Sequence, residues 1–481
     1  MSTAAPGERL VVHRRNPRRV LQGLITLGAV LAATVVTAIP AAGALGGGQP
    51  VVGGRRPHVG PIAEISRGCA GQNAEAEQAV DGRYVYVAWI GCNGIGFARS
   101  TNGGRTFAGP VIVPGSFGHG FHRRGIGFGL PKYGWDPSVA VAPNHTVYVA
   151  YMLYRHSHVH PMVAISYDHG ATFARVSRPA SPIRNNWGDR PFIAVGPAGT
   201  VYLTWDFGRS LNVKSRHGNI VMQKSVDGGK TWSRIAVVSP GFPDHGGGVA
   251  APLLVEPGGR LDVAFWEWSG GALAPYALPP NHIYFTSSAD GGRTWSKPVA
   301  IRPGAGRIGF LVTWIDVALS IDAAGNLYAT WDTQHPGDDI GWLSYSTDHG
   351  RTWSAAWRVT PDHDKAEHIM AVTAGPPGVA YVGWLTGGPI FTHSARRFSQ
   401  YLRPFSINTG WLAGPIRVSR QFGNRNVWPG DTIGISLLPT HGHAPQKIQL
   451  SWGSAVSGPN SQIFTATVTM RTPGGEAVRG H

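Results

Sequence analysis

Charged side chains, cysteine and helical patterning are all scarce in this chain. Only 14% of its 481 residues are Asp, Glu, Lys or Arg, and only two are Cys. Beyond the first forty residues, no stretch repeats apolar residues with the period of an amphipathic helix. These absences exclude helical bundles, coiled coils and small disulfide-rich folds. Gly (67 copies) and Trp (17 copies) are abundant instead, which is typical of a turn-rich β protein with aromatic packing.

Acidic residues are fewer than basic residues in this chain. The chain has 26 Asp and Glu against 42 Lys and Arg, which gives a net charge of +16. About +12 remains without the five arginines and one glutamate of the N-terminal segment. This excess predicts association with anionic partners such as wall polymers, acidic glycans or phospholipid surfaces. The basic residues are scattered and no nucleic-acid module is recognisable, so we expect no nucleic acid partner.

Long apolar runs are confined to the N-terminus. Five arginines precede a nearly uncharged run from Val20 to Ile39, and Ala42-Gly43-Ala44 follows as a cleavage site. Residues 1–44 are therefore predicted to be a signal peptide; an uncleaved membrane anchor is the alternative, since twenty apolar residues can span a bilayer. In both cases we expect a secreted or extracytoplasmic protein. Residues 45–59 are expected to be a linker and residues 472–481 a flexible tail.

One eight-residue phrase, Ser-x-Asp-x-Gly-x-Thr-Trp/Phe, recurs five times. The copies begin at Ser100, where Asn102 replaces the Asp, and at Ser166, Ser225, Ser288 and Ser346, and a degenerate sixth begins at Ser406. The intervals are 58 to 66 residues. The Asp carboxylate can accept backbone N–H bonds within its own turn, and the Gly permits a conformation that other residues resist. A repeat of this length with only short strands predicts a β-propeller.

A second repeat indicates how many blades the propeller has. Alternating apolar runs such as VYVAW end in an aromatic residue seven times, at Trp89, Tyr151, Trp205, Phe265, Trp331, Trp384 and Trp452. Seven such strands predict seven four-stranded blades, with six as the alternative. The segment 60–66 is similar to the fourth strands, so we expect it to pair beside residues 461–470 and close the last blade. The propeller is predicted over residues 60–471.

The eight-residue phrase resembles the Asp-box, or BNR repeat, of the sialidase superfamily. In that family the box is a structural turn between the third and fourth strands of a blade, away from the ligand site. The resemblance therefore implies a structural role for Asp168, Asp227, Asp290 and Asp348. Sialidases have six blades, three arginines that clamp the substrate carboxylate, a Tyr–Glu nucleophile pair and an Arg-Ile-Pro signature. Arg55-Arg56-Pro57 is not that signature and no Tyr–Glu pair stands out, so the resemblance covers the repeats and not the catalytic set.

A ligand site is predicted on the face opposite the boxes. Acids lie at the start of most first strands, which are innermost in a propeller; they include Glu75, Glu77 and Glu367. The residues predicted to be catalytic are Asp136, Asp189, Arg190, Asp316 and Asp431. The predicted ligand-binding residues, able to stack on sugars or bind carboxylates, are Trp135, Trp187, Trp314, Arg307 and Arg425. No cofactor is expected, although such a ring of carboxylates is also a fit for calcium; the alternative is that each acid caps its loop.

Cysteine and histidine offer two further candidates. Cys69 and Cys92 flank the first inner strand and are predicted to form a disulfide where the N-terminal strand joins the ring. His156, His158 and His160 alternate along one predicted loop and could bind a transition metal. A solvated loop is the preferred interpretation, so no metal site is predicted.

Two functions remain open from the sequence. The first is an exported, monomeric propeller that binds glycans or proteins at the cell envelope. The alternative is a sialidase-like glycoside hydrolase that uses carboxylates at the mouth of the central channel.

Overall fold

The computed structural model describes residues 56–118, 133–155, 158–179, 187–208, 219–239, 248–249, 252–267, 283–302, 317–333, 340–361, 367–387, 397–419, 422–423, 429–442 and 444–471. All regular structure in these ranges is β-strand. None of the described residues forms a helix long and apolar enough to cross a membrane. The N-terminal apolar run and the predicted tail lie outside the described residues.

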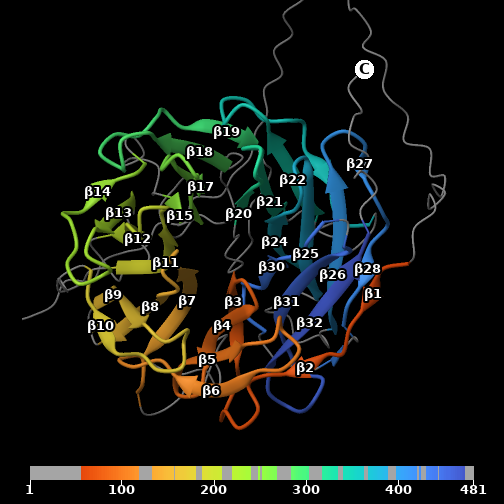
Figure 1. Ribbon diagram of the computed structural model, residues 1–481, viewed down its shortest axis with the longest axis horizontal. Helices are drawn as coiled ribbons and strands as arrows, with labels where there is room; N and C mark the ends of the chain where they lie inside the picture. The colour runs from red at the N-terminus through yellow and green to blue at the C-terminus, as the bar shows by residue number, and fades with distance from the viewer. Residues whose placement is uncertain are drawn as a thin grey trace, which may run out of the picture. The chain divides into compact units, whose positions relative to one another are not determined.

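The strands form seven antiparallel sheets, the blades of a seven-bladed β-propeller (Figure 1). The prediction of seven blades, rather than six, is confirmed. From the inside outwards, blade 1 has β3 (Ala74–Asp81), β4 (Tyr84–Gly91), β5 (Gly94–Ser100) and β6 (Ala108–Ile112). Blade 2 has β7 (Gly134–Val141), β8 (Val147–Arg155), β9 (His158–Ser166) and β10 (Arg175–Ser177). Blade 3 has β11 (Trp187–Val195), β12 (Val201–Gly208), β13 (Asn219–Ser225) and β14 (Ala236–Val237).

The remaining blades follow the same plan. Blade 4 has β15 (Gly248–Val249) and β16 (Leu253–Val255) inside, then β17 (Leu261–Glu267), β18 (Ile283–Ser288) and β19 (Val299–Arg302). Blade 5 has β20 (Ala318–Ile321), β21 (Leu327–Thr333), β22 (Ile340–Ser346) and β23 (Trp357–Arg358). Blade 6 has β24 (Glu367–Ala374), β25 (Val379–Gly387) and β26 (Arg397–Ser406), with β27 (Gly410–Trp411), β28 (Ile416–Arg417) and β29 (Phe422–Gly423) outside.

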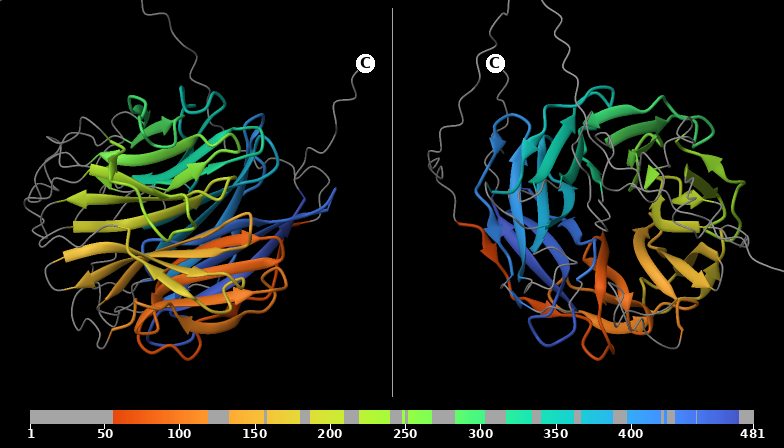
Figure 2. Two further views of the ribbon diagram at one scale, coloured as in Figure 1. Left: turned by 60° about the vertical axis from the view of Figure 1, so that its left-hand side comes forward. Right: turned by 180° about the vertical axis from the view of Figure 1, so that it is seen from behind.

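Blade 7 combines both ends of the propeller. Its inner strands are β30 (Gly434–Leu438), β31 (Gln446–Ser454) and β32 (Gln462–Met470), and its outer strands are β1 (His58–Val59) and β2 (Ala63–Glu64), which pair with β32 (Figure 2). The register Ala63↔Thr465 confirms the predicted closure by residues 60–66. The sheet begins at His58, within the segment expected to be a linker. Closure in this way leaves no unpaired edge at the junction.

The core lies between the blades. All seven aromatic residues that end the second strands are buried to 1% exposure or less, which explains the recurring aromatic in the sequence. Each is a large apolar surface removed from water at a blade–blade contact. The junction at the start of blade 1 is also held covalently, because Cys69 and Cys92 form a disulfide that closes a 23-residue separation.

The Asp-boxes form the turns between third and fourth strands. In the blade 3 box, Asp227 Oδ1 accepts hydrogen bonds from the Thr231 and Lys230 backbone N–H groups and the Ser225 hydroxyl, while Oδ2 accepts one from the Thr231 hydroxyl. The Thr231 bonds and the Ser225 bond hold the pKa of Asp227 well below its usual range. Because antiparallel strands alternate in direction, these turns lie at the end of each blade opposite the start of its first strand.

Asp227→Ala is expected to lower the temperature of unfolding, because two backbone N–H groups lose their acceptor. Asp227→Asn is expected to have a much smaller effect. Asn102 already replaces Asp in the first box, where it accepts from the Thr106 N–H at 3.0 Å and donates to the Thr106 hydroxyl at 2.7 Å. Thermal unfolding of both variants checks this, and equal losses for Ala and Asn would contradict it.

Candidate functional site at the mouth of the central channel

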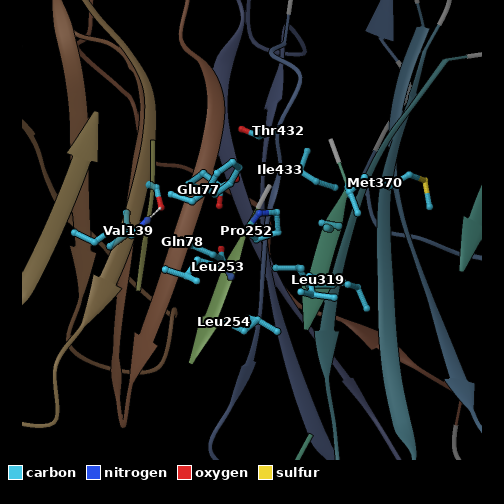
Figure 3. Close-up of a pocket in the computed structure, with 18 residues that line it drawn as sticks. Glu77, Gln78, Val139, Pro252, Leu253, Leu254, Leu319, Met370, Thr432 and Ile433 are labelled. Atoms are coloured by element: carbon cyan, nitrogen blue, oxygen red, sulfur yellow. Dashed lines mark hydrogen bonds between the residues drawn. The ribbon is translucent and has the colours of Figure 1, made fainter. Parts of the chain in front are cut away.

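A cavity of about 240 Å³ runs along the propeller axis and is lined by one segment from every blade (Figure 3). Most of its wall is aliphatic, and the polar residues Glu77 and Thr432 lie toward one end while Leu254 lies at the other. The lining residues include Glu77, Gln78, Ser138, Phe192 and Thr432. The end with Glu77 corresponds to the start of the first strands, opposite the Asp-boxes.

Three neighbouring first strands carry the same irregularity at that end. The register of β3, β7 and β11 shifts at Glu75-Ala76, Asp136-Pro137 and Arg190-Pro191, so that two residues face one on the second strand. The single residue opposite is Trp89, Tyr151 or Trp205. Such β-bulges redirect side chains. Blades 1, 2 and 3 therefore present a charged residue at one equivalent position.

The backbone at these bulges is in a left-handed conformation that residues with a Cβ rarely adopt. The φ angles are 55° at Glu75, 47° at Asp136 and 49° at Arg190. Each such residue costs about 1–3 kcal/mol, and such residues cluster at functional sites. Three of them side by side at the mouth of a channel therefore indicate a functional site.

Blade 7 completes the cluster. Arg190 Nη2 lies 2.8 Å from Asp431 Oδ1, which joins blade 3 to the segment before β30. The Glu75 N–H donates to the Pro429 carbonyl at 3.2 Å. Gly430, with φ of 104°, passes so close to the Glu75 backbone that a Cβ would clash, which explains the Gly in Pro429-Gly430-Asp431.

Among the described residues, the cluster has more carboxyl groups than guanidinium groups. Glu75, Glu77, Asp136 and Asp431 surround a single guanidinium, Arg190, and Glu75, Arg190 and Asp431 are only 1%, 5% and 7% exposed. Burial raises the pKa of Glu75 well above its usual range, and the negative charges of Asp431 and Asp136 raise it further, against the effect of Arg190. A hydrogen bond joins the carboxyl groups of Glu75 and Asp136. Burial and the neighbouring negative charges therefore favour the protonated form of Glu75.

Glu77 extends the cluster into the channel. Burial raises its pKa from 4.5 to about 8; Arg190 acts in the opposite direction, and the charge of Asp431 adds to the rise. The chemistry available at this site is proton transfer, because two carboxyl groups with raised pKa values lie beside an ion-paired carboxylate. Glu75 Oε2 is buried and has no hydrogen-bond partner in the described part of the chain, so it is a position that can carry a proton.

Glu77→Gln should remove a pH-dependent loss of stability. A folded-state pKa above the unfolded value means that the folded protein binds the extra proton, so stability falls as pH rises from 4.5 to 8. Converted in full to free energy, the pKa shift of Glu77 corresponds to about 5 kcal/mol. Water in the channel reduces this effect, so we expect the free energy of unfolding of Glu77→Gln to exceed that of the parent by about 2 kcal/mol at pH 8.5. At pH 4 the two should be equally stable. Urea unfolding at both pH values measures this; a difference that does not grow with pH would contradict it.

Comparison with known proteins agrees with this architecture. The BNR/Asp-box repeat family model matches residues 344–355, which form the fifth box. A sialidase of Micromonospora viridifaciens is 26% identical over 275 residues, 53% of this chain and 39% of that protein, so the chain spans well under two thirds of the length of that relative. This chain is a seven-bladed β-propeller that carries BNR/Asp-box repeats and is similar to sialidases.

Matches among solved structures include a polysaccharide lyase and a sialidase. A polysaccharide lyase, the PL25 ulvan lyase, superposes with a TM-score of 0.52 at 15% identity, over 86% of this BNR propeller and 96% of the lyase. The Hadza microbial sialidase Hz136 has a TM-score of 0.44 at 13% identity, with 81% and 74% of the chains covered.

The structure of this BNR propeller brings together three of the five residues predicted to be catalytic: Asp136, Arg190 and Asp431. Asp189 lies beside them in β11, opposite Asp206, and its side chain is not described. The side chain of Trp187, the first residue of β11, is likewise not described. Half-buried Trp135 packs against the apolar cluster of blades 1 and 2. Asp316, Trp314, Arg307 and Arg425 lie outside the described residues.

Sequence reasoning did not select Glu75 and Glu77, although it noted both as acids before a first strand. It also equated Asp189 with Asp136 because both are acids. The two prolines contained the better signal: aligning Pro137 with Pro191 places Arg190, not Asp189, at the level of Asp136. From His156, His158 and His160, only His160 has a described side chain, and it is buried at 4% exposure.

Proposed function

We propose that this propeller binds a glycan at the mouth of its channel and cleaves a glycosidic bond there by acid–base catalysis. The observation that carries the proposal is the hydrogen bond between Glu75 and Asp136 at a bulged strand start, where burial and neighbouring negative charge raise the pKa of Glu75 well above its usual range. Glycosidases use a carboxylic acid of raised pKa to protonate the leaving oxygen. The similarity to a sialidase and to polysaccharide lyases supports a glycan as the substrate class.

The geometry suggests how the roles are divided. Glu75 and Asp136 are in direct hydrogen-bond contact, which leaves no room for a sugar between them, so they act as one proton-donating unit. Asp136 is the half-buried, more accessible member, and Glu75 is the buried member that holds the proton. Asp431, ion-paired with Arg190, is the second carboxylate, which activates water or stabilises positive charge at the anomeric carbon.

The charges favour an uncharged sugar at the point of cleavage. A sialic acid carboxylate requires unpaired arginines, whereas the described cluster has one arginine, already bound to Asp431, and four carboxyl groups. Among the described residues the cluster therefore offers no arginine outside an ion pair to an acidic sugar, and the charge of Asp136 opposes one. The positive net charge of the whole chain favours binding to an anionic polymer of the cell envelope, and the uncharged sugar at the cleaved bond would be one of the units of that polymer. We further propose that the protein acts outside the cytoplasm as a monomer; the apolar N-terminal run supports export.

A second candidate, glycan binding without cleavage, is favoured by the burial of the cluster. Glu75, Arg190 and Asp431 are nearly inaccessible, and the same contacts fasten blade 7 to blades 1 and 3. In that case the charges are a structural network that closes the ring, and the ligand contacts only the rim.

A library of neutral and anionic glycans distinguishes the two candidates, with binding and released sugar measured on the same samples. We expect release from glycans with a neutral sugar at the cleaved bond, and its loss in Glu75→Gln. Binding without release in the parent would support the second candidate. Neither binding nor release would exclude both.

A further inference from the structure

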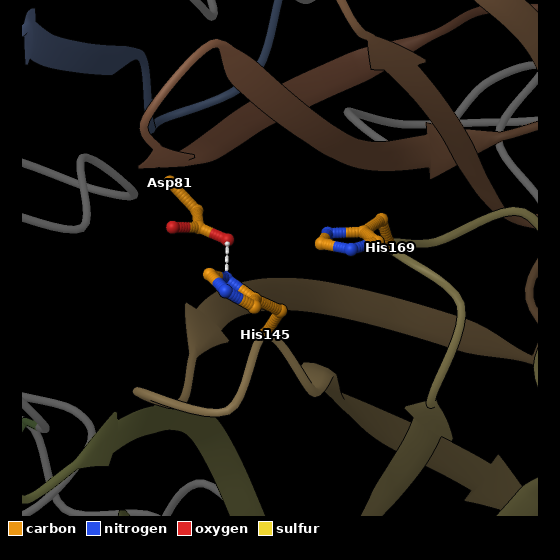
Figure 4. A group of neighbouring side chains, drawn as sticks. All are labelled: Asp81, His145 and His169. Atoms are coloured by element: carbon orange, nitrogen blue, oxygen red, sulfur yellow. Dashed lines mark hydrogen bonds and ion pairs between the residues drawn. The ribbon is translucent and has the colours of Figure 1, made fainter.

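We propose a zinc-class transition-metal site on the opposite face of the propeller, formed by Asp81, His145 and His169 (Figure 4). One potential ligand atom from each side chain lies within 4.8 Å of those of the other two, so short side-chain movements would bring all three to a single zinc ion. Two imidazoles and one carboxylate are a donor set that suits zinc and its neighbours rather than calcium or magnesium. The proposal is independent of the glycan function.

The three residues meet because of the blade topology. Asp81 ends β3 in blade 1, His145 lies in the turn between β7 and β8, and His169 belongs to the Asp-box of blade 2. All three positions are at the box end of the strands. A metal bound here would therefore link the inner hairpin of blade 1 to two turns of blade 2, at a distance from the Glu75–Asp136 pair.

The side chains are already oriented toward one another. His145 Nδ1 lies 2.6 Å from Asp81 Oδ2, and the ring centroids of His145 and His169 are 5.0 Å apart. Tyr84 stacks on His169 with centroids 4.3 Å apart and planes 11° apart, which fixes the imidazole so that its edge faces the other two residues. The backbone is held in the left-handed region at both histidines, with φ of 65° and 54°. This preorganisation reduces the cost of collecting three ligands.

Access is adequate for an ion. The His145 side chain is 56% exposed and that of Asp81 is 22% exposed. Three protein ligands leave a fourth position of a tetrahedral site for water or for a donor from another molecule.

An equivalent place elsewhere in the ring shows how such a cluster looks when a cation from the protein fills it. His349 occupies the same box position in blade 5 and lies 3.2 Å from Glu256 of blade 4. There the Arg260 guanidinium lies 3.2 Å from Asp262 and 3.7 Å from Glu256, and it donates to the His349 carbonyl. In blade 1 the corresponding arginine, Arg83, lies over the Tyr84 ring instead. The neighbour of the Asp81 carboxylate is instead a second imidazole, that of His145, and not a guanidinium such as that of Arg260.

Zinc titration of the full chain, purified without an affinity tag, tests the proposal. The parent for this experiment is His156→Gln/His158→Gln, because that loop could also bind zinc. We expect one zinc ion per chain by calorimetry and a rise in unfolding temperature with zinc. Cobalt(II) in the same site should give the strong visible absorption of a four-coordinate ion. His145→Asn and Asp81→Asn should each weaken zinc binding by at least about 100-fold.

The control is His349→Asn, the same substitution at the equivalent box position. It should bind zinc like the parent. Asn tolerates the left-handed backbone of His145 and His349, so these variants should fold. If Asp81→Asn does not fold, His145→Asn alone tests the proposal. The proposal is overturned if the parent shows no saturable zinc binding. It is also overturned if His145→Asn binds zinc as tightly as the parent, or if His349→Asn loses as much affinity.

Discussion

Asp136→Asn is expected to reduce glycan cleavage by about 10²- to 10⁴-fold, because an amide can neither transfer a proton nor pass on the proton that Glu75 holds. Asparagine suits this position sterically: it has the shape of aspartate and tolerates the φ of 47°. Glycan binding should therefore change little. Initial rates of sugar release and the dissociation constant for the same glycan are to be measured together.

The matched control for this variant is Asp290→Asn, an Asp-box substitution on the opposite face. Its carboxylate is bound by the Thr294 N–H and hydroxyl groups, as Asn102 is bound by Thr106. It should retain full activity. Undiminished cleavage by a folded Asp136→Asn protein would remove the Glu75–Asp136 pair from the mechanism.

Arg190→Met is expected to destabilise the propeller by about 3–5 kcal/mol, the usual result of removing one partner from a buried ion pair. Asp431 would lose the guanidinium 2.8 Å away, and Glu75 and Glu77 would lose the charge that lowers the pKa of each. Denaturant unfolding measures the loss. The double variant Arg190→Met/Asp431→Asn should recover part of it, because the unpaired carboxylate is then absent.

Arg293→Met is the comparison for Arg190→Met. Arg293 is exposed, and within the described ranges its side chain hydrogen-bonds only to the nearby Asp290 carbonyl, through Nε at 3.2 Å, so its replacement should cost little. Equal effects of the two arginine substitutions would show that Arg190 is not part of a buried network.

The fold could be predicted from the sequence because each repeat contains its own local signal. The box phrase specifies a turn through Asp227, Ser225 and Thr231, and the second-strand aromatics specify which side chains are buried. Repetition made the blade count visible. Even the closure by residues 60–66 had a local signature, since that segment is similar to the other fourth strands.

The site was only partly predictable, because its geometry depends on strand register. Glu75 and Arg190 are brought together by bulges opposite Trp89 and Trp205, and a bulge leaves no clear signature in residue type. Acidic character alone pointed to Asp189. The Asp81, His145 and His169 cluster was not foreseen for a related reason: its members are far apart in the sequence and meet only when blades 1 and 2 are adjacent.

The most direct test of the account is infrared difference spectroscopy of the carboxyl groups at pH 7, comparing the parent with Glu75→Gln. If the Glu75–Asp136 pair holds a proton, the parent shows a protonated-carboxyl stretching band that disappears in the variant, while the bands of other protonated acids cancel. Identical spectra in this region, with Glu75 ionised at pH 7, would contradict an acid–base site at the mouth of the channel.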